Sequence, residues 1–129
     1  MQTTRITSTL VIAGLTLAAL APGAARADGP QAISTAAQHA GMAAASADLG
    51  MAQRHLHHVL NCLVGPGGEG FDAAAGNPCG AAGGAIPQTA DAAAKGKLQK
   101  VADETRKAIA LPDLDATKKA AGEIQALLK

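Results

Sequence analysis

The chain has 129 residues, of which 48% are apolar and 1% aromatic, and its formal net charge is +1. Alanine supplies 33 residues and Phe71 is the single aromatic one, whereas β-sandwiches and barrels need β-branched and aromatic residues. The near-neutral charge and the missing aromatic platforms also exclude a nucleic-acid binder of the stacking type. The composition therefore predicts one small all-α domain.

Residues 1–27 have the layout of a secretory signal peptide. A basic N-terminus precedes an apolar run at 6–20, and residues 25–27 read Ala-Arg-Ala, the small-residue pattern of a cleavage site. The run is too short to span a membrane comfortably. We therefore expect a mature chain 28–129 with no membrane span, exported to the periplasm or secreted. Its 9 basic and 10 acidic residues give it a net charge of −1.

Residues 31–63 of the mature chain have the apolar spacing of two helices. A shift of 65 residues aligns it with a second such segment at 91–128, and Asp48 and Asp113 then fall on equivalent positions. Each aspartate precedes an apolar periodic stretch and is expected to cap a helix N-terminus. Two helical hairpins of this kind predict an antiparallel four-helix bundle.

Residues 64–90 between the hairpins are rich in glycine and proline, and they are expected to form a loop. Cys62 and Cys79 are the two cysteines of the chain, and in an exported protein they are expected to form a disulfide. This bond would pin the loop to the end of the second helix. The chain contains neither the Cys-x-x-Cys redox motif nor the Cys-x-x-Cys-His haem-attachment motif.

The four histidines all lie in the first hairpin. A helix places 51, 55, 58 and 62 on one stripe, and a turn near Asp48 brings the preceding helix alongside. The candidate metal ligands are His39, His55, His57, His58, Met42 and Met51. Imidazole with thioether suits copper better than zinc or nickel. His57 projects to another side of its helix. The sequence thus predicts a transition-metal site, copper favoured, in the seam of this hairpin.

Other interpretations of the same residues remain open. The histidines are alternatively solvated surface residues or a pH-sensing cluster, and the methionines gap-filling side chains. The chain would then be a non-catalytic structural or interaction bundle without metal. Such a bundle could form a homodimer. An enzyme is not expected, because the disulfide removes the thiol nucleophile.

The exported, alanine-rich double hairpin resembles the small periplasmic four-helix-bundle metal-binding proteins. The residues that carry this resemblance are His39-Ala40 and the stretch His55-Leu56-His57-His58. It implies a helical bundle that binds metal ions through histidines, but the second hairpin has no histidine, unlike those proteins. The b-type cytochrome bundles, by comparison, hold haem between a methionine of the first helix and a histidine of the fourth. The last helix here has neither residue, so no haem is expected.

Overall fold

The computed structural model describes residues 29–80 and 83–129, so the expected signal peptide 1–27 lies outside the described residues. The described chain is all-α, as predicted, and contains no strand. Its helices are α1 (Gly29–Ala44), α2 (Leu49–Val64), α3 (Ala85–Gln88), α4 (Ala92–Ile109) and α5 (Leu114–Leu127).

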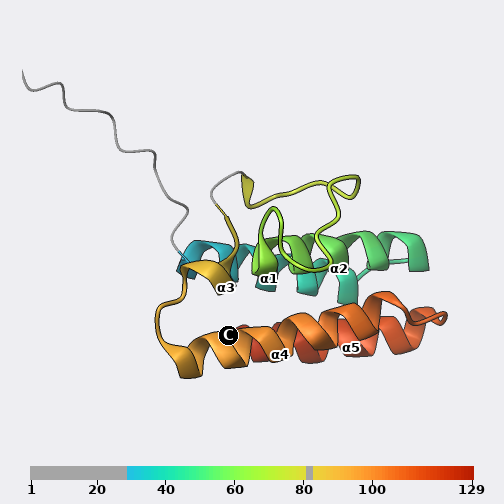
Figure 1. The fold of residues 1–129 in the computed structure, drawn as a ribbon. Coiled ribbons are helices and arrows are strands. Elements are labelled where there is room, and N and C mark those ends of the chain that lie inside the picture. Colours follow the sequence, from blue (N-terminus) through green and yellow to red (C-terminus); the bar gives the residue numbers. More distant parts are fainter. Residues whose placement is uncertain (1–28, 81–82) are drawn as a thin grey trace, which may run out of the picture.

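The four long helices are arranged as two hairpins that pack against each other. Short turns join α1 to α2 and α4 to α5. Helix α1 contacts both α2 and α5, while α4 contacts both α2 and α5. In Figure 1 the pair α1 and α2 forms one layer and the pair α4 and α5 the other. No described helix has the length and apolar character needed to cross a membrane.

Aspartate side chains begin three of the long helices. The carboxylates of Asp48 and Asp113 each accept a hydrogen bond of 2.8 Å from a backbone N–H three residues later. These two caps confirm the prediction from the sequence. Asp91 caps α4 in the same way, with a bond of 2.7 Å from the backbone N–H of Ala94. The bonds satisfy donors that have no partner within the first helical turn.

The core combines a helix of small side chains with helices of larger ones. Every buried residue of α1 is an alanine, whereas α2 contributes leucines and Val59. Small side chains let α1 approach its neighbours closely, and a Cβ on Gly41 would collide with the Gln125 side chain of α5. The fully buried apolar residues of these two helices are Ala32, Ala36, Ala40, Ala43, Ala52, Leu56, Val59, Cys62 and Leu63.

The segment predicted as loop 64–90 contains the short helix α3, which the sequence did not predict. The close approach of Gly84 to Gly65 explains why the chain forms this helix. Gly84 lies against the end of α2, where any Cβ would overlap the backbone of Val64 and Gly65. This contact carries Ala85 into the core, where it is fully buried. The backbone then closes one helical turn through bonds from the N–H of Thr89 to the carbonyls of 85 and 86.

The disulfide between Cys62 and Cys79 is present as predicted, with the two Cα atoms 5.4 Å apart. It joins the last turn of α2 to the glycine-rich loop, which folds back along this helix (Figure 1). An intramolecular disulfide is typical of proteins in an oxidising, exported compartment.

Candidate metal centre

Three of the four histidines converge in the seam between α1 and α2. Nδ1 of His39 lies 3.2 Å from Nδ1 of His55 and 3.3 Å from Nδ1 of His58. All three side chains are half-buried, and each offers one ligand nitrogen within 4.8 Å of the others. Within 29–80 and 83–129 these residues are the one group of three or more His, Cys, Asp or Glu side chains so arranged.

The local fold explains why these positions meet. His55 and His58 are separated by three residues on α2 and therefore face the same side of the helix. The turn at 45–48 reverses the chain, so that α2 runs back along α1. The neighbours of His39 on the buried face of α1 are Ala36, Ala40 and Ala43. Because these side chains are small, α1 lies near enough for His39 to reach the imidazoles of α2.

The nitrogen spacing matches the edge of a coordination tetrahedron. Metal–nitrogen bonds of about 2.0–2.1 Å place two tetrahedral ligands about 3.3–3.4 Å apart. The two measured Nδ1–Nδ1 separations, 3.2 and 3.3 Å, are close to this value. The separations of His39 from the other two rings therefore each match one tetrahedral edge, and one ligand atom of each of the three rings lies within 4.8 Å of the others.

Hydrogen bonds alone do not satisfy this arrangement of nitrogens. A neutral imidazole carries one N–H, so Nδ1 of His39 has at most one proton to share between two facing nitrogens. If that proton is absent, the contact with His58 brings two lone pairs together, because the Ala75 carbonyl 2.7 Å from Nε2 of His58 requires the proton of that neutral ring on Nε2. A cation at the centre would accept all three lone pairs at once. The three rings could therefore hold a metal ion.

The surroundings favour the neutral form of two rings of the cluster, those of His39 and His55. Burial lowers the pKa of His39 from its ordinary value of 6.5, and the neighbouring His58 and His55 lower it further. Burial also lowers the pKa of His55, with contributions from His58 and Arg54. A metal competes with protons for the same lone pairs, so a lowered pKa leaves the ligands free at neutral pH.

The remaining predicted ligands lie elsewhere or are exposed. His57 points to another side of α2, as the sequence predicted, and its Nδ1 lies 3.6 Å from a carboxylate oxygen of Asp72. It lines a separate cavity of about 440 Å³ together with Arg54 and Asp72. Met42 and Met51 are 44% and 43% exposed. Their role as ligands stays a prediction.

The sequence reasoning did not identify the loop as part of the site. Nε2 of His58 lies 2.7 Å from the carbonyl oxygen of Ala75, a residue of the glycine-rich loop. This segment is held by Asn61, a fully buried polar residue of α2. The one available signal was an asparagine inside an apolar helical stripe, since a buried amide requires hydrogen-bond partners.

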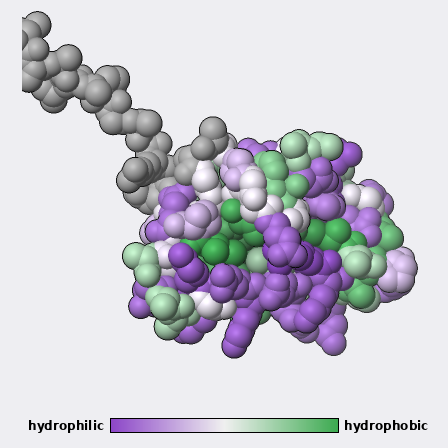
Figure 2. Space-filling view, viewed as in Figure 1, coloured by the Kyte–Doolittle hydropathy of each residue, from purple (hydrophilic) through white to green (hydrophobic). Residues whose placement is uncertain are grey.

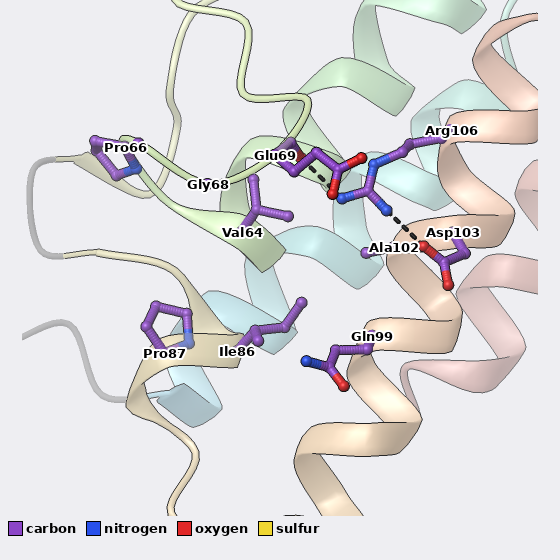
Figure 3. A pocket seen from close by; sticks show the side chains of 11 residues that line it. Val64, Pro66, Gly68, Glu69, Ile86, Pro87, Gln99, Ala102, Asp103 and Arg106 are labelled. Carbon is purple, nitrogen blue, oxygen red and sulfur yellow. Dashed lines mark hydrogen bonds and ion pairs between the residues drawn. The ribbon is translucent and has the colours of Figure 1, made fainter.

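A second hollow lies on another face of the molecule, between the loop, α3 and α4. This groove of about 610 Å³ is shown in Figure 3, where Arg106 of α4 reaches the loop at Glu69. Figure 2 shows apolar surface between the two layers, bordered by hydrophilic side chains. The guanidinium donates bonds of 2.6 Å to Asp103 and 2.8 Å to the Glu69 carbonyl. Arg106 therefore ties the loop to α4.

No protein-family model matches this chain, and no curated protein or solved structure matches it significantly. The interpretation of the site depends on its own geometry.

Proposed function

We propose that this chain is an exported protein that binds one transition-metal ion through His39, His55 and His58. The observation that carries the proposal is the convergence of three imidazoles, in which Nδ1 of His39 lies 3.2 Å from Nδ1 of His55 and 3.3 Å from Nδ1 of His58, and one ligand atom of each ring lies within 4.8 Å of the others. A neutral hydrogen-bonded cluster leaves such contacts incompletely satisfied, whereas a cation uses every lone pair. The centre is proposed to bind rather than to catalyse, since both cysteines are oxidised and supply no thiol nucleophile.

Copper is the metal that we propose first. A given nitrogen site binds Cu²⁺ more tightly than Zn²⁺ or Ni²⁺, and imidazole suits all three ions. The tetrahedral spacing of the nitrogens makes zinc the second candidate. Met42 and Met51 would add softer thioether ligands if they reach the ion, which would favour Cu⁺.

The cellular setting forms part of the same proposal. The disulfide supports an oxidising compartment, and the layout of residues 1–27 supports cleavage of a signal peptide and a periplasmic location. The pairwise contacts of the four long helices support an antiparallel four-helix bundle. These features agree with the resemblance to small periplasmic metal-binding bundles.

Titration calorimetry of the mature chain tests the proposal. We expect one Cu²⁺ or Zn²⁺ ion per chain, and loss of this binding in the double variant His55→Ala/His58→Ala. The matched control is His57→Ala, which removes a histidine of the same helix outside the cluster. Absence of binding for copper, zinc and nickel would contradict the proposal and favour a structural bundle without metal, whose dimerisation light scattering would reveal.

A further inference from the structure

The two nitrogens of His58 have different partners. Nε2 lies 2.7 Å from the carbonyl oxygen of Ala75, and Nδ1 lies 3.3 Å from Nδ1 of His39. A carbonyl oxygen only accepts hydrogen bonds, so Nε2 must carry the proton. In the neutral ring, Nδ1 then bears the lone pair, and this lone pair is directed toward the other imidazoles. The loop carbonyl thus selects the ligand atom of His58.

Asn61 fixes the loop segment that contains this carbonyl. Its side chain is fully buried and lies three residues after His58 on α2. The amide nitrogen donates bonds of 2.7 Å to the carbonyls of Asp72 and Gly76, and the amide oxygen accepts a bond of 2.9 Å from the N–H of Asp72. These three bonds bracket Ala75 on both sides.

Two further features hold the segment in place. The Asp72 carboxylate accepts bonds from the N–H groups of Ala74, at 2.9 Å, and Ala75, at 3.3 Å. Gly76 has a φ of 95°, a backbone conformation that glycine adopts at little cost, and it lies against the His58 ring. The carbonyl of Ala75 is therefore held by the fold.

We propose that Asn61 is a positioning residue for the metal centre, because it holds the Ala75 carbonyl on Nε2 of His58 and so makes Nδ1 the metal ligand. This inference rests on the proposed function. A hydrogen bond to the distal N–H fixes the tautomer and orientation of a ligating imidazole and raises its basicity. The glycine-rich loop is then the second coordination sphere of the centre.

The first test uses the unmodified mature chain. Zn²⁺ is added as a diamagnetic probe, and the side-chain nitrogens of His58 are observed by ¹⁵N NMR. We expect coordination at Nδ1 and a proton on Nε2 that is protected from exchange with solvent. Zinc coordination of His58 through Nε2 would overturn the inference while leaving the proposed function intact. Absence of zinc and copper binding would overturn both.

The second test compares variants at the loop anchor. Loss of a second-sphere partner typically weakens metal binding about 10–100-fold, and we expect this loss for Asn61→Ala together with faster exchange of the His58 Nε2 proton. The control Ile124→Val in α5 reduces core packing away from the loop and should leave both zinc affinity and the NMR signature in place. Unchanged affinity and exchange in a folded Asn61→Ala chain would overturn the inference.

Discussion

The two hairpins share a packing pattern but differ in the chemistry of their seams. Shifted by 65 residues, Val59 corresponds to Ile124, and both are buried in the core. The same shift pairs the three clustered histidines with Glu104, Ala120 and Glu123. These three residues also lie together, around a small cavity of about 60 Å³ in the second hairpin.

The comparison separates what builds the fold from what builds the site. Most positions that are buried in both hairpins carry apolar residues, because either hairpin must bury one face; the exceptions are Thr105 and Thr117, which correspond to Ala40 and Ala52. The three seam positions are adjacent in both hairpins, yet they carry imidazoles only in the first. In the first hairpin, the loop after α2 also brings the carbonyl oxygen of Ala75 to Nε2 of His58. The second hairpin is therefore an internal control for the metal centre.

The largest effect should come from building the ligand set into the second hairpin. We expect the variant Glu104→His/Ala120→His/Glu123→His to bind a second Zn²⁺ ion, because these positions correspond to the three histidines. The exposed pair of Glu104 with Lys107, 2.8 Å apart, would be lost at little cost. The new site should be weaker than the first, since Ala126 stands at the position equivalent to Asn61, which anchors the loop in the first hairpin.

Calorimetric stoichiometry measures this outcome. The matched control places glutamine at the same three positions, which changes charge and size without adding ligands, and should leave one ion per chain. A stoichiometry of one for the histidine variant would show that the two seams are not equivalent in geometry.

Reduction of the disulfide should have the next largest effect. The bond closes a loop with a sequence separation of 17 residues, and loss of such a link costs about 3 kcal/mol of unfolding free energy. The destabilisation should be uneven, because the bond ends at α2. Hydrogen exchange should accelerate in the loop and the end of α2 more than in α5. Uniform acceleration throughout the described helices would contradict this account.

Acidification should destabilise the metal-free chain through its first hairpin. The pKa values of His39 and His55 are lowered on folding, so the unfolded chain binds more protons and stability falls as pH decreases below about 6.5. Above that pH both imidazoles are neutral in the folded and the unfolded chain, so they do not change the free energy of unfolding. Chemical unfolding at a series of pH values should show a flatter profile for His39→Gln/His55→Gln. An unchanged profile in that variant would assign the effect to other groups.

The smallest effect is expected from replacing Met42 and Met51, the two methionines of the first hairpin. Met42 and Met51 are nearly half exposed, so replacement by leucine should barely change stability. If their thioethers reach the ion, Met42→Leu/Met51→Leu weakens binding of Cu⁺ but leaves Zn²⁺ affinity unchanged. Competition titrations with both metals measure this. Equal affinities of variant and parent for Cu⁺ would remove the methionines from the ligand set.

Much of the helical framework was predictable because its signals are local. Capping by Asp48 and Asp113 depends on residues within one turn, and apolar periodicity shows which face of each helix is buried. The disulfide followed from two cysteines in an exported chain. The short helix α3 was not predictable, because it depends on the close contact of Gly84 with the end of α2.

The clustering of the histidines was predictable from the sequence, but their contact with the loop was not. Helical spacing places His55 and His58 on one side and His57 on another, and the turn brings His39 alongside. The contribution of Ala75 was inaccessible, because a backbone carbonyl leaves no trace in the sequence. Only the buried amide of Asn61 indicated that the loop would be tied to α2, and its partners required the folded structure.

The central claim is that three imidazoles of the first hairpin hold one metal ion. X-ray absorption spectroscopy of the mature chain loaded with one equivalent of copper or zinc tests it most directly. The account predicts three imidazole nitrogens at about 2.0 Å from the ion, and loss of this imidazole signal in the double variant His55→Ala/His58→Ala. A spectrum with one or no imidazole in the parent chain, or the same spectrum in both proteins, would contradict it.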